Sequence, residues 1–210
     1  MQKIKKICFP DSDAHFLDRI DGDGFYQRAQ FTKSVSYISK PRVFIDIGAH
    51  VGLWSRQGIL HGFGAAYCFE PCEENYICLV NNMSKYPVAT FMVAIGKQGT
   101  CKVVSDCADN SGAMHIESDG SVYIDSLTKF IGCPVAFKER YGLLGNDCLM
   151  KIDVEGTELD VIEACRDFIM EIRPIICIEQ RKDRIACDKL IEWGMVELKR
   201  VHCDYIMGWA

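Results

Sequence analysis

Residues 43–52 read Val43-Phe44-Ile45-Asp46-Ile47-Gly48-Ala49-His50-Val51-Gly52. This stretch decides the fold class. Its first part is a short apolar run that ends at a carboxylate, which is typical of a strand buried on both faces of a parallel sheet. Two glycines follow, four positions apart, and glycine lets a backbone turn sharply and pass close to a ligand. Because an apolar helical stripe begins at Leu53, the stretch predicts a strand, a tight turn and a helix in succession.

The same alternation of apolar runs and helical spacing continues along the chain. Further strands are expected at 65–69, 89–95, 148–152 and 174–178, with a closing antiparallel pair at 196–201 and 205–207. Helices are expected between them, including one from about 157 to 168. The fold class is therefore α/β: a Rossmann-like, doubly wound, mainly parallel sheet of seven strands.

The length of the chain fits one domain, because 210 residues bury about 70% of the surface that the unfolded chain exposes. Residues 41–210 form this domain, with an irregular, glycine-punctuated insertion on the substrate side around 97–147. Residues 1–40 form an N-terminal helical attachment, since the apolar side chains of this region suggest one helix face. These side chains are Phe25, Tyr26, Phe31, Val35 and Ile38.

Composition and charge exclude several classes of partner. The formal net charge is -5 and the basic clusters are short, which argues against a nucleic-acid partner. No apolar run approaches the ~20 residues of a membrane span. Twelve cysteines contain no Cys-x-x-Cys pair, so we assign no metal ligands and expect a reducing, cytoplasmic setting.

Four of the expected strands end in an acidic residue: Asp46, Glu70, Asp153 and Glu179. A lone acid at a strand end is more often a helix cap. Four of them share one edge of a parallel sheet, and ligands bind beyond this edge, where the strand order reverses. The dinucleotide fingerprint needs glycine where this chain has His50 and Leu53, which weakens a nicotinamide cofactor. Glu70 suits ribose hydroxyls and Pro71 suits the face of an adenine, so the site favours a nucleoside with an aliphatic, zwitterionic tail.

Six segments in order resemble the FkbM-type family of class I S-adenosylmethionine-dependent methyltransferases. They are residues 43–52, Phe69-Glu70-Pro71 with Asn75 and Leu79, Val93-Ala94-Ile95-Gly96, Ile124-Asp125-Ser126-Leu127, Met150-Lys151-Ile152-Asp153-Val154-Glu155-Gly156-Thr157-Glu158, and Ile178-Glu179. The resemblance spans about 25–207 and implies the class I methyltransferase fold, S-adenosylmethionine as cofactor, and usually O-methylation of a hydroxyl on a sugar or natural product. This chain departs from the family at His50, where asparagine is more common, and at Tyr26-Gln27, where tyrosine precedes glutamate.

On this resemblance the cofactor site has eight residues. They are Asp46, Gly48, Ala49, His50, Gly52, Glu70, Pro71 and Ala94. Transfer of a methyl group to a hydroxyl requires alignment of the acceptor and a base that removes its proton. Asp153 is the first candidate for the base and Glu155 the second. Both acids could instead favour the following helix through its dipole, or hold Mg²⁺ as a pair. His115 and His202 are alternative bases.

The predicted function is O-methylation of a hydroxyl on a sugar, a glycan or a small natural product. The partner is accordingly a small-molecule or carbohydrate acceptor, with no nucleic acid and no membrane, and the oligomeric state stays open. Two alternatives remain: a nicotinamide-dependent Rossmann oxidoreductase, and an α/β binding module that holds the cofactor without catalysis.

Overall fold

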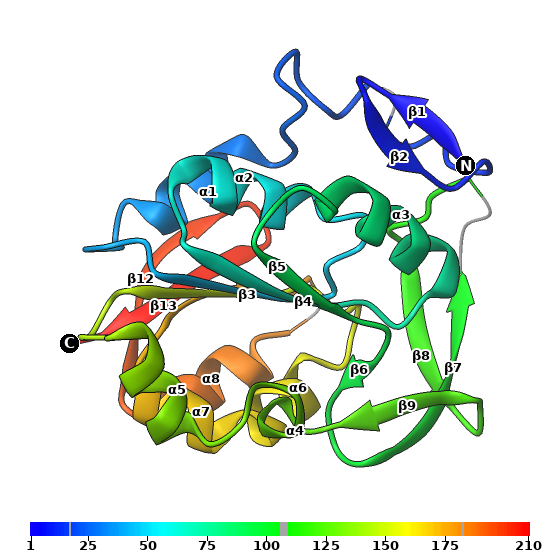
Figure 1. The fold of residues 1–210 in the computed structure, drawn as a ribbon. Helices are drawn as coiled ribbons and strands as arrows, with labels where there is room; N and C mark the ends of the chain where they lie inside the picture. The colour runs from blue at the N-terminus through cyan, green and yellow to red at the C-terminus, as the bar shows by residue number, and fades with distance from the viewer. Residues whose placement is uncertain (17, 106–108, 182) are drawn as a thin grey trace.

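The computed structural model describes residues 1–16, 18–105, 109–181 and 183–210. Within these residues the centre is a seven-stranded sheet with the order β12-β13-β11-β10-β3-β4-β5 (Figure 1). Its strands are β3 (Val43–Ile47), β4 (Ala65–Phe69), β5 (Val88–Phe91), β10 (Cys148–Ile152), β11 (Ile175–Glu179), β12 (Met195–Val201) and β13 (Asp204–Trp209). Strand β13 runs antiparallel to both of its neighbours, β12 and β11, and the other strand pairs of this sheet are parallel. The mainly parallel seven-stranded sheet predicted from the sequence is confirmed.

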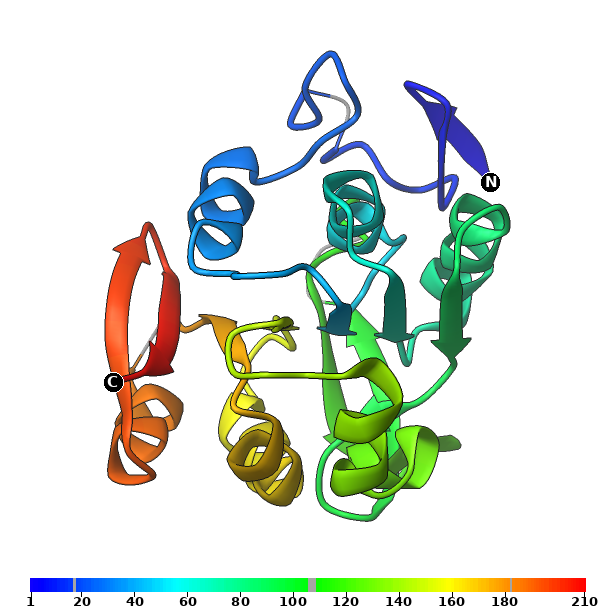
Figure 2. The ribbon, with the colours of Figure 1, turned by 60° about the vertical axis from the view of Figure 1, so that its left-hand side comes forward.

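Helices cover both faces of this sheet, as Figure 2 shows. One face carries α1 (Arg28–Val35), α2 (Leu53–His61) and α3 (Glu73–Met83). The other carries α4 (Leu127–Ile131), α5 (Pro134–Tyr141), α6 (Glu158–Ala164), α7 (Arg166–Ile172) and α8 (Ile185–Glu192). Successive side chains of a strand point to opposite faces, so Val43 and Ile45 join one buried cluster and Phe44 joins the other. Burial on both faces explains why these strands are apolar throughout.

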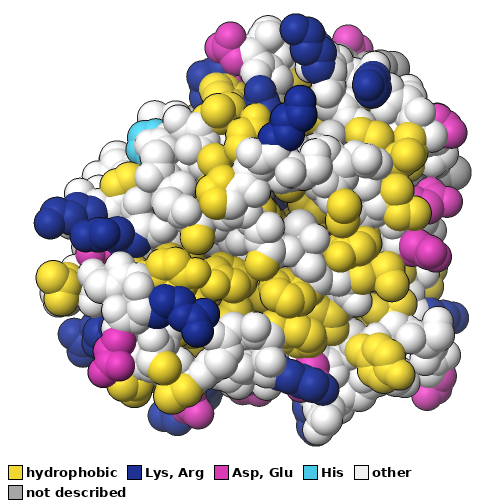
Figure 3. Space-filling view, viewed as in Figure 1, with side chains coloured by type: hydrophobic (Ala, Val, Ile, Leu, Met, Phe, Trp, Pro, Cys, Tyr) yellow, Lys and Arg dark blue, Asp and Glu magenta, His cyan; other side chains and the backbone are white. Residues whose placement is uncertain are grey.

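The third expected strand is divided in the structure. Strand β5 ends at Phe91, and β6 (Ala94–Ile95) leaves the main sheet to pair with β9 (Val122–Asp125). A second sheet results, with the order β6-β9-β7-β8, in which β7 (Gly99–Ser105) and β8 (Met114–Ser118) form a hairpin. A continuous apolar pattern cannot reveal this division, because both pieces are buried or half-buried β structure. The main sheet therefore ends at β5. On the face of the molecule seen in Figure 1, hydrophobic side chains gather in a band across the middle (Figure 3).

Two further expectations on helices need correction. The helix expected from about 157 to 168 is two helices, α6 and α7, which meet at Cys165. The N-terminal attachment is not mainly helical: it contains the hairpin of β1 (Gln2–Ile4) and β2 (Ile7–Phe9), and α1 as its one described helix. Lys5 and Lys6 both have positive φ and form the hairpin turn. The sequence gives no sign of this turn, because such turns usually contain glycine, asparagine or aspartate.

The segment 97–147 contains β7, β8, β9, α4 and α5, and its residues 106–108 lie outside the described part of the chain. It connects the second sheet back to β10, and the loop at 109–112 lines the pocket described below. Among the helices of the described residues, none combines the length and the apolar character that crossing a membrane requires.

Candidate functional site

A pocket lies at the carboxyl ends of β3, β4, β10 and β11, where the strand order reverses. It encloses about 1050 Å³ of empty space, including the part open to solvent. Nine of the ten residues assigned to the site from the sequence line it: Asp46, Gly48, Ala49, His50, Glu70, Pro71, Ala94, Asp153 and Glu155. They come from four separate segments of the chain, and the switch point of the sheet brings them together.

Gly52 is the exception, because it does not line the pocket. It precedes α2 with a φ of 87°, and a Cβ atom there would lie 2.8 Å from the Cδ1 atom of Leu79 on α3. The second glycine of the turn therefore lets α2 and α3 pack closely.

Gly48 is the glycine that shapes the pocket. Its φ is 77°, and a Cβ atom there would lie 1.8 Å from the carbonyl oxygen of Asp153, a distance that no side chain can adopt. The backbone of Asp153 in turn donates a hydrogen bond to the carbonyl of Ile47 at 3.0 Å. The turn after β3 is thereby pressed against the turn after β10, with backbone exposed to a ligand between them.

Glu70 fixes the other side of the glycine turn. One carboxylate oxygen accepts a hydrogen bond from the His50 backbone at 2.8 Å, and the other accepts one from the Cys72 backbone at 2.9 Å. Burial raises the pKa of Glu70 to about 7. The carboxyl group thus joins the end of β4 to the turn after β3, at the position where the sequence predicts contact with a ribose.

Asp46 is completely buried at the end of β3. Its Oδ2 atom accepts a hydrogen bond from the Ser55 hydroxyl at 2.5 Å, while its Oδ1 atom has no partner among the described residues. Burial raises the pKa of Asp46 to about 6. Buried acceptors are rarely left without a donor, so the unpaired oxygen beside the pocket fits a site that a ligand completes.

Lys151 is a buried cation in the lining of the pocket, only 4% exposed. It lies beside Asp46 on the neighbouring strand, and its Nζ atom donates to Asp153 Oδ2 at 2.8 Å. Burial alone would lower the pKa of Lys151, but the carboxylates of Asp153 and Asp46 together raise it above its ordinary value. Burial likewise opposes ionisation of Asp153, yet Lys151 holds the pKa of that carboxyl below its ordinary value. Asp153 is therefore ionised at neutral pH.

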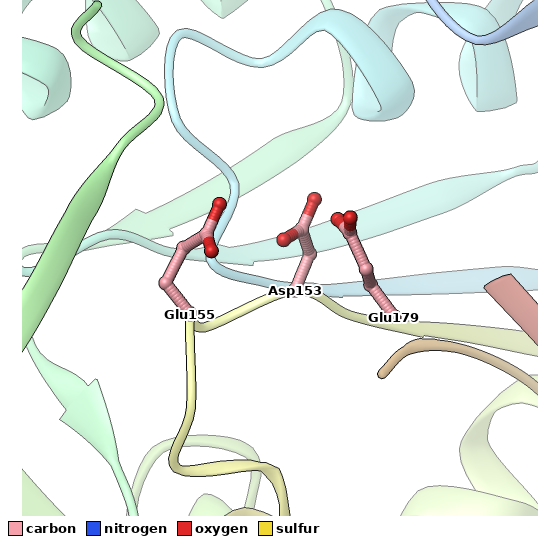
Figure 4. Close-up of side chains that lie close together, drawn as sticks. All are labelled: Asp153, Glu155 and Glu179. Atoms are coloured by element: carbon pink, nitrogen blue, oxygen red, sulfur yellow. The ribbon is translucent and has the colours of Figure 1, made fainter. Parts of the chain in front are cut away.

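Glu179 and Glu155 flank Asp153, and Figure 4 shows the three carboxyl groups pointing to the same side. One oxygen from each lies within 4.8 Å of the other two, a spacing that a metal ion could use. Burial and the neighbouring Asp153 raise the pKa of Glu179 to about 8, so Glu179 holds a proton at neutral pH. The Nε atom of Arg181 lies 2.6 Å from Oε1 of Glu179, and its Nη2 atom lies 3.4 Å from Oε1 of Glu155. With Lys151 and Arg181 in place, the cluster is already balanced by cations of the chain itself.

A second cavity opens beside the first, with about 1450 Å³ of empty space including the part open to solvent. Asp153, Glu155 and Glu179 line both cavities. The walls of the second cavity are polar and include Thr157 and His115. His202, the other histidine considered as a base, lies in neither cavity but on the turn between β12 and β13.

Sequence reasoning missed several residues of the pocket, chiefly Lys151, Arg181, Phe16 and Tyr26. Lys151 offered a signal, because a single lysine inside an otherwise apolar buried strand must find a partner. The aromatic residues offered none, since their contact with the pocket depends on how the N-terminal segment folds back.

Known proteins resemble this chain in sequence and in fold. A family model described as the methyltransferase FkbM domain matches residues 46–200, which is most of the chain. The protein belongs to the FkbM methyltransferase family. The methyl donor of this family is S-adenosylmethionine, so the nicotinamide alternative is set aside. No curated protein matches the sequence.

Solved structures share the fold of this FkbM-family protein at low sequence identity. Methyltransferase FkbM from Methylobacillus flagellatus KT is 16% identical, with a TM-score of 0.52, over 81% of this chain and 44% of that one. Precorrin-6y C5,15-methyltransferase from Geobacter metallireducens GS-15 is 12% identical, with a TM-score of 0.50, over 92% of each chain. This chain thus spans less than half the length of the Methylobacillus protein, and likeness at such identities shows the fold alone.

Proposed function

We propose that this protein transfers the methyl group of S-adenosylmethionine to a hydroxyl group of a small-molecule or carbohydrate acceptor. The observation that carries the proposal is the position of Asp153. Its carboxylate lies where the pocket at the strand ends meets the second, polar cavity, and Lys151 keeps it ionised. A cofactor in the first cavity and an acceptor in the second would meet beside this base.

The residues present fit the cofactor. S-adenosylmethionine, when bound, supplies a sulfonium methyl group that is reactive towards an oxygen nucleophile. The backbone at Gly48 and Ala49 forms a side-chain-free wall, Glu70 offers carboxylate oxygens for ribose hydroxyls, and the unpaired oxygen of Asp46 offers an acceptor for a donor group. The chain contributes mainly alignment, which can lower a reaction barrier by roughly 7–11 kcal/mol in favourable cases.

A hydroxyl acceptor supports the choice of Asp153 as the catalytic base. An alcohol holds its proton tightly at neutral pH, so it would need a base within hydrogen-bond reach in order to accept a methyl group. The proton passes to a carboxylate oxygen of Asp153, and Glu155, which lines both cavities, is the second candidate. The polar walls of the second cavity, among them Thr157 and Asn110, suit an acceptor rich in hydroxyl groups.

Cofactor binding tests the first half of the proposal. Asp46→Asn and Glu70→Gln keep side-chain volume but replace one carboxyl oxygen, a hydrogen-bond acceptor, with an amide nitrogen that can only donate, so each should weaken S-adenosylmethionine binding by about tenfold or more in calorimetry. Glu74→Gln, at an exposed position in the first turn of α3, is the matched control and should bind like the wild type. Unchanged affinity in both buried variants would place the cofactor elsewhere.

Methyl transfer tests the second half. Tritiated S-adenosylmethionine should label one or more members of a panel of glycans and hydroxylated metabolites, and the product should carry the label on oxygen. Binding of the cofactor without transfer to any hydroxyl compound, together with transfer to an amine, would redirect the proposal to another acceptor class.

A further inference from the structure

The N-terminal segment 9–16 folds back over the glycine turn. The ring of Phe16 stacks on the imidazole of His50, with centroids 4.9 Å apart and planes inclined by 28°. The ring of Phe9 stacks on the ring of Phe16, with centroids 5.4 Å apart. His15 and Phe16 both line the pocket at the strand ends. Residues remote from the sheet therefore form part of the pocket wall, and we refer to segment 9–16 as the strap.

A chain of three polar side chains, two of them buried and the third, His50, half-buried, ties the strap to the pocket. Asp13 is 2% exposed and Ser111 is 4% exposed. Asp13 accepts hydrogen bonds from the Ser111 hydroxyl, from the Ser111 backbone at 3.2 Å and from the Phe16 backbone at 3.2 Å. The Nε2 atom of His50 lies 2.6 Å from the Ser111 hydroxyl oxygen. The chain thus runs from the strap through the loop at 109–112 to the glycine turn.

The chemistry of serine fixes the direction of these hydrogen bonds. A hydroxyl has one hydrogen, and the Ser111 hydroxyl gives it to the carboxylate of Asp13. The imidazole must then donate from Nε2 to the Ser111 oxygen, which makes His50 the Nε2–H tautomer. Burial lowers the pKa of His50 to about 4, so the ring is neutral at physiological pH. The hydrogen bonds that link the three side chains are thus compatible with a single arrangement of protons.

Backbone contacts hold the same segments together. The amides of Ala14 and His15 donate to the carbonyl of Asp109 at 2.9 and 3.1 Å. The side-chain amide of Asn75, on α3, donates to the carbonyl of Ser111 at 2.9 Å. The strap and the loop at 109–112, which form two walls of the pocket, are therefore hydrogen-bonded to each other, and the loop is hydrogen-bonded to the glycine turn through His50.

A buried carboxylate is costly to maintain and needs hydrogen bonds to compensate for lost hydration. Apolar side chains at these positions would join the strap to the domain at lower cost, as Ile7, Phe9 and Val51 already do nearby. We propose that the strap completes the cofactor site and that Asp13, Ser111 and His50 are positioning residues that latch it over the bound cofactor. This inference rests on the proposed function, since it concerns the same pocket.

The test measures binding and release of S-adenosylhomocysteine. Ser111→Ala and Asp13→Asn should each weaken binding by about tenfold, through faster dissociation at a nearly unchanged association rate. Asp11→Asn is the matched control, because Asp11 lies in the same strap region but is exposed and pairs with the N-terminal ammonium group. Calorimetry gives the dissociation constant, and stopped-flow displacement gives the release rate.

A second measurement separates a latch from a general loss of stability. Arg19 is exposed just after the strap, so trypsin can cut there. Saturating S-adenosylhomocysteine should slow this cleavage several-fold in the wild type, and much less in Ser111→Ala. Thermal unfolding of each variant without ligand checks that the domain remains folded.

The outcomes separate the two proposals. If the wild type binds S-adenosylhomocysteine while Ser111→Ala and Asp13→Asn release it at the wild-type rate, the latch is refuted and the proposed function stands. If the wild type does not bind the compound at all, both are refuted. Should Asp13→Asn fail to fold, Ser111→Ala decides, because it removes only one hydroxyl group.

Discussion

At the level of single residues, Lys151 controls the charge of the site. A buried ammonium group is stable only when it is paired, and here three carboxyl groups surround it on neighbouring strand ends. Lys151 holds the pKa of Asp153 below its ordinary value, so Asp153 stays ionised, whereas burial and the neighbouring Asp153 raise the pKa of Glu179, which keeps a proton. Two acids at adjacent positions thereby acquire different protonation states, which is a common arrangement where one must serve as a base.

The role of Asp153 gives the first prediction at this scale. Asp153→Asn should leave S-adenosylmethionine affinity within about twofold but lower the transfer rate by roughly 10²–10⁴, because an amide cannot take the acceptor proton. Calorimetry and the tritium transfer assay measure the two quantities. Asp167→Asn, exposed on α7, is the control. Turnover that survives in Asp153→Asn would reduce Asp153 to a group that stabilises the start of the following helix.

At the level of elements, the site depends on two turns that touch. The turn after β3 and the turn after β10 come from adjacent parallel strands, and they meet at Gly48 and Asp153. The glycine at the contact lets the backbone of the proposed cofactor site lie against the backbone of Asp153, the proposed base. In the proposed function, the distance between the methyl donor and the base is therefore set by strand pairing and not by loop conformation.

Gly48→Ala tests this contact. The added Cβ atom would overlap the carbonyl oxygen of Asp153, so the substitution should cost roughly 3 kcal/mol or more of stability and abolish S-adenosylmethionine binding. Gly142→Ala is the matched control: this glycine also has positive φ, but nothing lies within 4 Å of its Cβ position. The control should lose only about 1–2 kcal/mol, measured by urea unfolding. Equal losses in the two variants would show that conformation and not contact limits position 48.

At the level of the whole molecule, the buried acids couple stability to pH. In the folded chain Glu179 has a pKa of about 8 and Glu70 a pKa of about 7. In the unfolded chain both carboxyl groups have the ordinary glutamate pKa of 4.5 and lose their protons at lower pH. The folded state therefore binds more protons, and the free energy of unfolding falls as pH rises through this range. The lowered pKa of His50 acts with the opposite sign, but only below its ordinary value of 6.5.

The window from pH 6.5 to pH 8 isolates the effect of the acids. The free energy of unfolding in urea should fall by on the order of 1 kcal/mol across it. Glu179→Gln should flatten this slope, because glutamine does not titrate, whereas the exposed Glu74→Gln should leave it unchanged. A wild-type stability that rises over the window would contradict the assigned protonation of Glu179.

The seven-strand alternation and the positions of the strand-end acids were predictable because each depends on local patterns. Apolar runs, glycines and helical spacing are properties of neighbouring residues. The division of the third strand at Phe91, the N-terminal hairpin and the break between α6 and α7 were not predictable, since each depends on which distant strand or helix a segment packs against. Gly52 illustrates the same limit: its glycine is required, but by the contact between α2 and α3 and not by the pocket.

The sequence by itself determined that a parallel α/β sheet carries a glycine turn and four acids at one edge, because strand direction and side-chain period follow from the order of residues. Only the tertiary structure decided that Lys151 pairs with Asp153 and keeps it ionised, and that Arg181 pairs with Glu155. It also decided that Asp13 is hydrogen-bonded to Ser111, which in turn contacts His50. The physical reason is that charge pairing and hydrogen bonding act over a few ångströms in space, between residues as far apart as 98 positions along the chain.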